Sequence, residues 1–203
     1  MDTAVALCPP PVAPHSEPVS AAATPTPFPS PALPQVLQAM GGFALLGLAG
    51  GLGSGVVELA LRSLPAGLLV AVGTGVLTTP ALLVAHQLGR FKAAPDVVLG
   101  ALSGAFVQTG RLALALVPVV AFFAATSGLW SVVFALFALL LGAVASSSAA
   151  RRLYATEPPA TSSDVPRFAM LVLGWQVLSL LVALRLAVAA VGFVLSPLTG
   201  GAL

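Results

Sequence analysis

Residues 168–195 read FAMLVLGWQVLSLLVALRLAVAAVGFVL, a stretch in which Arg185 is the single charged side chain. At about 1.5 Å per residue, a helix of this length exceeds the roughly 30 Å hydrocarbon core of a bilayer. An apolar run of this length is typical of a membrane-spanning helix. The stretch therefore predicts a transmembrane helix that ends before Pro197.

Four more apolar runs precede this one, at about 37–61, 66–88, 97–125 and 129–150. We expect Arg62 and Pro65 to end the first run, and a polar loop over 151–167 to separate the last two. Only helices or closed barrels satisfy the backbone inside lipid, and runs of this length fit helices. The pattern predicts an all-α, polytopic membrane protein, a bundle of about five transmembrane helices.

The composition agrees with this class. Hydrophobic residues make up 58% of the 203 residues and charged residues only 7%, with a mean hydropathy of +1.06. An ordinary soluble domain is about 25% charged, so water is the wrong solvent for most of this chain and membrane lipids are its expected surroundings. A net charge of +2 without a basic cluster favours no nucleic-acid partner.

Residues 1–34 form a compositionally distinct segment without Lys or Arg, and residues 35–203 form the expected membrane domain. Proline interrupts both helices and sheets, and a proline-rich segment with little apolar surface to bury stays extended. We expect a disordered, proline-rich cytoplasmic tail. Its prolines stand at positions 9, 10, 11, 14, 18, 25, 27, 29, 31 and 34.

Loop cations predict the orientation, because positively charged loops are retained in the cytoplasm. With five spans, Arg62 is the single loop cation on the side opposite the tail. This predicts a multi-pass protein of the cell membrane with its N-terminus cytoplasmic and its C-terminus outside. The abundance of Ala, Gly, Pro and Arg favours a bacterial inner membrane. The cations on the tail's side are Arg90, Lys92, Arg151, Arg152 and Arg167.

Gly47, Gly51 and Gly55 recur every fourth residue in the first run and predict a small-residue groove on one helix face. Ser54 and Glu58 continue the same stripe. Glycine faces let transmembrane helices approach closely, as in a glycine zipper. We expect this face to pack another helix, either within the chain or in a homo- or hetero-oligomer; a glycine-lined pathway is the alternative.

Arg111 lies near the middle of the third run, where a charge costs about 2.5–3.5 kcal/mol on insertion scales. Gly104 and Gln108 share its helical stripe. We therefore expect a polar seam inside the bundle, acting as a structural hydrogen-bonding centre or as an anion, lipid-headgroup or conduction site. Arg111→Leu is expected to lower stability or activity more than Glu58→Gln.

Glu58 is the sole carboxylate within the predicted spans and has three candidate partners, Arg62, Arg111 and Arg185. Arg62 stands four residues later in the favourable order for a helical ion pair, which favours a local pair. Of the other two, Arg185 is the easier partner, because it shares the outer half of the membrane with Glu58. In the last run, Gln176 and Arg185 are expected to face opposite sides of the helix.

Motifs for catalysis are absent from the sequence. It contains no H-E-x-x-H and no Walker loop, and its spans hold no pair of aspartates and no deep histidine. One cysteine and two histidines do not predict a metal site, and we expect no enzyme and no cofactor. Two classes of function remain: a scaffold or accessory subunit of a membrane complex, or a small oligomeric channel or transporter with its anion- or headgroup-favouring seam at Arg111.

Overall fold

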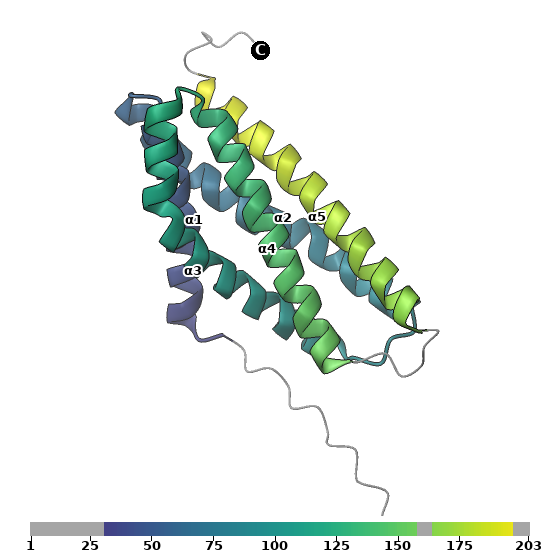
Figure 1. The fold of residues 1–203 in the computed structure, drawn as a ribbon. Coiled ribbons are helices and arrows are strands. Elements are labelled where there is room, and N and C mark those ends of the chain that lie inside the picture. Colours follow the sequence, from purple (N-terminus) through teal and green to yellow (C-terminus); the bar gives the residue numbers. More distant parts are fainter. Residues whose placement is uncertain (1–30, 158–163, 197–203) are drawn as a thin grey trace, which may run out of the picture.

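The computed structural model describes residues 31–157 and 164–196, and within these ranges the chain forms five α-helices and no strand (Figure 1). All five are long and apolar enough to cross a membrane, which confirms the predicted fold class. The proline-rich tail lies, as far as residue 30, outside the described residues. The helices are α1 (Leu33–Leu52), α2 (Val57–Leu88), α3 (Pro95–Ser127), α4 (Trp130–Thr156) and α5 (Asp164–Leu195).

The boundary between the first two spans differs from the prediction. The chain turns after Leu52, where Gly55 adopts a left-handed φ of 70° and the Ser54 hydroxyl donates to the carbonyl oxygen of Gly51 at 2.7 Å. Glycine takes this conformation without steric cost, so the turn forms here and not at Pro65. Pro65 is accommodated inside α2, and Glu58 therefore belongs to the first turn of α2.

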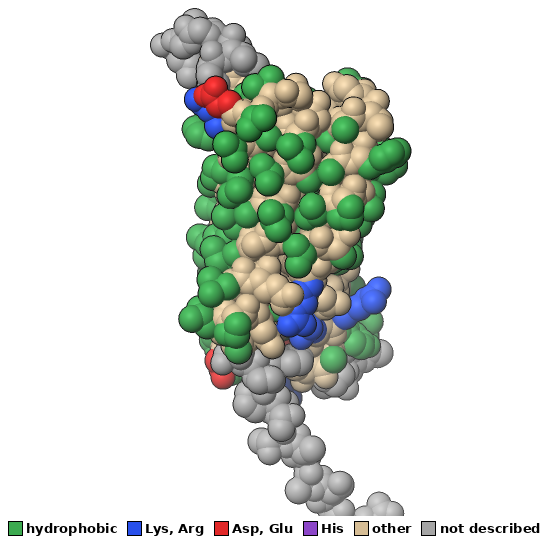
Figure 2. All heavy atoms as spheres, turned by 90° about the vertical axis from the view of Figure 1, so that its left-hand side faces the viewer, with side chains coloured by type: hydrophobic (Ala, Val, Ile, Leu, Met, Phe, Trp, Pro, Cys, Tyr) green, Lys and Arg blue, Asp and Glu red, His purple; other side chains and the backbone are tan. Residues whose placement is uncertain are grey.

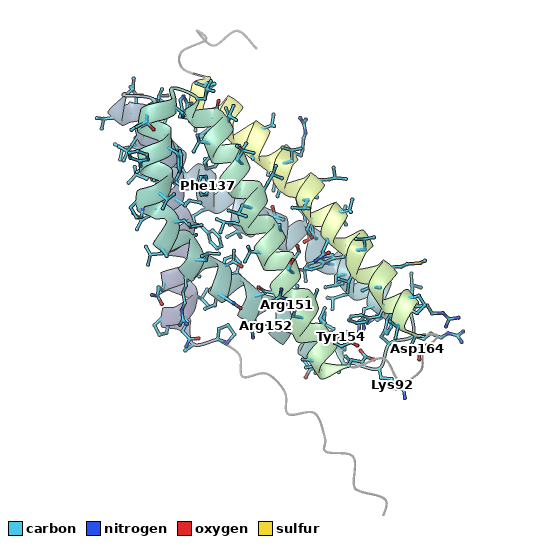
Figure 3. The ribbon with its side chains drawn as sticks, viewed as in Figure 1. Lys92, Phe137, Arg151, Arg152, Tyr154 and Asp164 are labelled. Carbon is cyan, nitrogen blue, oxygen red and sulfur yellow. The ribbon has the colours of Figure 1, made fainter. Side chains whose placement is uncertain are left out.

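The connection between the last two spans is also shorter than predicted. Helix α4 continues through Arg151 and Arg152 to Thr156, and α5 already begins at Asp164. Figure 3 shows both arginines on the last turns of α4. Apolar Leu153 remains buried between them and the helix end, so packing favours helix where charge alone suggested loop.

The helices form a closed ring in the order α1, α2, α5, α4, α3, each packing mainly against its two neighbours. The start of α1 and the α2–α3 connection lie at one end of the ring, whereas the α1–α2 and α3–α4 turns lie at the other (Figure 1). Helix α1 has 20 residues and its neighbours α2 and α3 have 32 and 33. Because α1 is shorter, it covers only part of the gap between them.

Small residues bring α1 close to both neighbours. A β-carbon added to Gly47 would overlap the carbonyl oxygen of Ser63 in α2, and one added to Gly42 would overlap that of Gly110 in α3. Close backbone approach of this kind is how helices associate when lipid offers no hydrophobic gain. These two crossings anchor α1 to the rest of the ring.

The outer surface suits lipid. Figure 2 shows one face of the molecule, on which hydrophobic side chains extend over its whole height; acidic and basic side chains gather at the upper end, and further Lys or Arg side chains lie within the lower part of the face. Large apolar residues such as Leu61, Phe122 and Leu181 are exposed on different helices. In water such a surface would be unfavourable, whereas in a bilayer it is the expected one.

Candidate functional site: an apolar cavity and an outward-facing arginine

Glu58 pairs locally. Its Oε1 accepts a hydrogen bond from the guanidinium of Arg62 at 2.7 Å, one turn later in α2. The Glu58 side chain is 68% exposed, and as an acid in the first turn of a helix it also interacts favourably with the helix dipole. The predicted i,i+4 pair is confirmed, and Glu58 is not the counter-ion of Arg111 or Arg185.

Gln108 and Arg111 lie on the outside of the ring. Both side chains are exposed on α3, so the expectation of a seam inside the bundle is wrong. The face of α3 that turns inward carries Ala105, Thr109 and Ala113 instead, because small residues allow the closer packing. Within the described ranges, Arg111 has no hydrogen-bonding or ion-pairing partner.

Arg152 is the residue that joins this outward face. Its guanidinium lies against Gly104, and it donates to Oε1 of Gln108 at 3.4 Å. Arg152 falls in the loop predicted over 151–167, so the sequence indicates no helical register for it. Together Gly104, Gln108, Arg111 and Arg152 make an outer basic face on α3 and the end of α4.

The last helix presents its polar residues as expected. Gln176 donates to the hydroxyl of Ser147 in α4 at 3.5 Å, whereas Arg185 is exposed on the outside of the ring. The two residues thus face different sides, and Arg185 lies apart from the outer basic face. Arg185 likewise lacks a polar partner among the described residues.

The glycine stripe divides into two parts. Gly47 and Gly51 are buried against α2, where Gly51 lies beside Ala60 and Ser63. Gly55 lies in the turn, and a β-carbon added to it would meet no atom within 4 Å. The groove is therefore filled by a helix of the same chain, and an oligomer contact through these glycines would require α2 to move away.

A cavity of about 540 Å³ lies inside the ring, lined by residues from all five described helices. Pockets that hold small molecules range from roughly 300 to 1,000 Å³. Its walls are mainly apolar, with Phe43, Leu46, Val70, Phe106, Leu141 and Trp175 among the larger side chains. The sequence could not predict it, because a cavity arises from the way whole helices cross.

The cavity opens between α2 and α3. Val76 and Pro80 of α2 and Leu99 of α3 line it and are also exposed on the outer surface, Val76 at 64% and Leu99 at 45%. Helices α2 and α3 make few contacts with each other, because each packs mainly against α1. These exposed lining residues belong to helices that are long and apolar enough to span a membrane.

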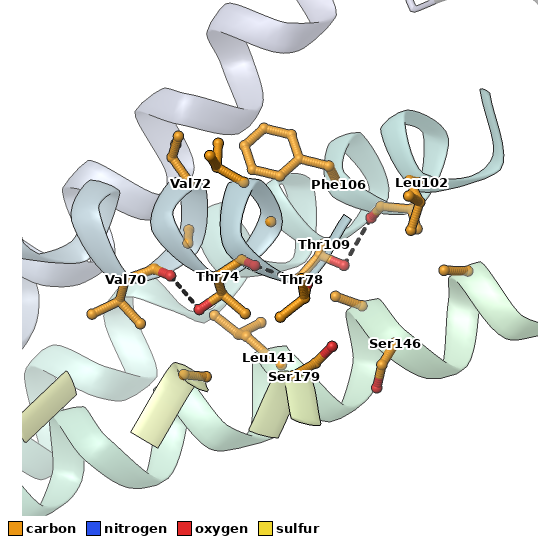
Figure 4. A pocket seen from close by; sticks show the side chains of 18 of the residues that line it. Val70, Val72, Thr74, Thr78, Leu102, Phe106, Thr109, Leu141, Ser146 and Ser179 are labelled. Atoms are coloured by element: carbon orange, nitrogen blue, oxygen red, sulfur yellow. Dashed lines mark hydrogen bonds between the residues drawn. The ribbon is translucent and has the colours of Figure 1, made fainter. Parts of the chain in front are cut away.

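Hydroxyl groups form the polar part of the lining (Figure 4). Thr74 donates to the carbonyl of Val70 at 2.6 Å, Thr78 to that of Thr74 at 2.8 Å, and Thr109 to that of Ala105 at 2.8 Å. Threonine hydroxyls inside membrane helices commonly bond the carbonyl one turn back in this way. The hydroxyl protons of these threonines are thereby already donated, whereas their hydroxyl oxygens can still accept a hydrogen bond.

Ser179 of α5 is the exception in this lining. Its side chain is 4% exposed, and its Oγ is buried with no hydrogen-bonding partner among the described residues. Figure 4 shows this hydroxyl directed into the space between the helices. Buried polar groups are nearly always satisfied, and leaving one unpaired costs about 1–3 kcal/mol.

A second polar cluster closes one end of the ring. His86 at the end of α2 is 3% exposed, and its Nε2 lies 3.0 Å from Oε2 of Glu157, which follows α4. The other oxygen of Glu157 accepts from the backbone N–H of Lys92. The ring of Phe91 lies tilted against that of His86, with centroids 5.2 Å apart, and meets the ring of Phe168 edge-on, with centroids 5.6 Å apart.

The sequence alone does not predict this cluster of His86 and Glu157. The two residues lie 71 positions apart along the chain, so no local pattern could signal their contact. It ties the α2–α3 connection to the end of α4. The described residues contain no group of three or more His, Cys, Asp or Glu placed to hold a metal.

Comparison of the chain with protein-family models, with curated proteins and with solved structures finds no match. The fold itself defines the class. Five apolar helices of spanning length, found in the parts of the chain that the structure describes, make this a multi-pass integral membrane protein.

Proposed function

We propose that this protein is a non-enzymatic scaffold or accessory subunit of a membrane complex, and that it binds its partner through the outer basic face. The observation that carries the proposal is the position of Arg111, exposed near the middle of a spanning helix and without a partner in the described ranges. A guanidinium facing hydrocarbon costs several kcal/mol unless a partner or the membrane interface relieves it.

A polar or acidic group on a neighbouring transmembrane helix would relieve this cost. Gln108, one turn away, adds a second hydrogen-bonding side chain to the same face. Gly104 has no side chain, so a neighbouring helix could approach the backbone of α3 closely there. Glutamine is among the side chains that hydrogen-bond across helices in membranes. The face thus combines the features expected of a contact between transmembrane subunits.

The alternative, a small channel or transporter, has weaker support. The interior cavity is lined mainly by apolar side chains, and Arg111 and Arg185 are both exposed on the outside of the ring. An anion path along Arg111 would have to run between chains of an oligomer. Anion flux through liposomes that Arg111→Leu abolished would favour this alternative over a scaffold.

Site-specific photo-crosslinking in the native membrane tests the scaffold proposal. A photoreactive amino acid replaces Leu112, which is exposed beside Arg111, or Leu181, which is exposed on α5 and serves as the matched control. We expect one discrete protein adduct from position 112 and no adduct from position 181. Arg111→Leu should reduce the yield of the position-112 adduct at least about tenfold. Equal crosslinking from both positions would contradict the proposal, and so would an adduct whose yield is unchanged by Arg111→Leu.

A further inference from the structure

We propose that the interior cavity binds a lipid-soluble molecule that carries a carbonyl oxygen on a long apolar chain, admitted from the bilayer between α2 and α3. The site is distinct from the outer basic face, and it stands or falls independently of the proposed function. Its three supports are the location of its mouth, the character of its walls and the unpaired hydroxyl of Ser179.

The mouth determines which molecules have access. Val76 and Leu99 line the cavity and are exposed on the surface of helices that span the membrane. A molecule that enters there comes from the hydrocarbon layer and not from water. The occupant is therefore dissolved in lipid, which favours a long-chain amphiphile over a polar solute.

The walls determine what is stable inside. Apolar cavities in proteins stay dry and take up apolar molecules, whereas water requires two to four polar partners. Here the larger lining side chains are Phe, Leu, Val and Trp, and the threonine protons are already donated to backbone carbonyls. A volume of about 540 Å³ suits a chain or ring system of small-molecule size and exceeds that of a few waters.

Ser179 sets the polar requirement. Its O–H is the one buried side-chain group without a partner in the described part of the chain, so it has a proton to donate. A carbonyl oxygen on the ligand would accept this proton and remove the cost of the unpaired group. Ser179 lies in the middle of α5, so the carbonyl must sit deep in the membrane, as in a lipid quinone or ketone.

Trp175 provides the measurement, because it lines the cavity and is buried. The chain has two tryptophans, so Trp130→Phe leaves Trp175 as the sole indole. The full-length protein in lipid bilayers is titrated with decylubiquinone, a quenching quinone on an alkyl chain, and separately with bromododecane, a quenching chain without a carbonyl. We expect saturable quenching by both probes, above the linear quenching expected from collisions in the lipid.

Two variants locate the probes. Gly75 lines the cavity, and a β-carbon there meets nothing within 4 Å, so Gly75→Leu adds a bulky side chain at the cavity wall without displacing the backbone. Gly174→Leu is the matched control, because Gly174 is equally free of neighbours and is exposed on α5. We expect Gly75→Leu to abolish the saturable component for both probes and Gly174→Leu to leave it unchanged.

Ser179→Ala separates the hydrogen bond from the apolar fit. It should weaken decylubiquinone binding by about three- to tenfold, which corresponds to the usual net contribution of one hydrogen bond to binding, and leave bromododecane binding unchanged. Equal weakening of both probes would overturn the role of Ser179. The proposed site would be overturned if the parent protein showed no saturable quenching, or if the two glycine variants behaved alike. Either result would mean that the probes do not occupy the cavity, and it would hold equally if another helix or the chain's own N-terminal segment filled the space.

Discussion

The charged residues of the spans separate into those that are neutralised inside the chain and those that are not. Glu58 and Arg62 satisfy each other within one turn of α2, whereas Arg111 and Arg185 point outward without partners in the described ranges. Helical periodicity predicted the first pair, because its spacing is local. It could not tell whether the stripe of Arg111 faces inward or outward, since both faces of α3 contain small and apolar residues.

The outward position of Arg111 changes the expected effect of its substitution. Arg111→Leu should leave the unfolding free energy of the purified protein in detergent within about 0.5 kcal/mol of the parent, because no contact inside the chain is lost. Glu58→Gln should lower it by no more than about 1 kcal/mol, as for other exposed ion pairs. Chemical unfolding followed by circular dichroism measures both. A loss of unfolding free energy above about 2 kcal/mol for Arg111→Leu would instead support the hypothesis that Arg111 is a buried hydrogen-bonding centre.

At the scale of the helices, the apolar runs predicted the number and type of elements, and their ends were the least accurate part. Pro65 suggested a helix end, yet the turn formed at Gly55, where the backbone needs a positive φ. Arg151 suggested a loop, yet the helix continues because Leu153 is buried. The first boundary is thus determined by the backbone conformation of one glycine and the second by the burial of one leucine.

The glycines of α1 make a direct test of this packing. Gly47→Val places a side chain against the backbone of Ser63 and Gly67, whereas Gly41→Val enters open space on the same helix and carries the same intrinsic helix cost. We expect Gly47→Val to be less stable than Gly41→Val by about 1–3 kcal/mol, the usual range for overpacking. Thermal unfolding in detergent compares them, and equal stability of the two variants would show that α1 does not depend on this contact.

At the scale of the whole molecule, the ring order and the cavity lie beyond what the sequence predicts. The contact between His86 and Glu157, and the gathering of Thr78, Thr109 and Ser179 around one space, join residues from distant helices. Such contacts are determined by the crossing of complete helices. Five spans do predict that successive connections alternate between the two ends of the bundle, as Figure 1 shows, whereas the assignment of one end to the cytoplasm stays a prediction.

Cysteine labelling from each side of sealed vesicles tests the central claim, that every one of these helices crosses the membrane. In a background with Cys8→Ser, single cysteines replace exposed Val56, Lys92, Ser127 or Ser196. A membrane-impermeant maleimide should label positions 56, 127 and 196 from one side and position 92 from the other, with position 92 on the cytoplasmic side. Labelling of position 92 from the same side as 56 or 127 would contradict the five-span fold.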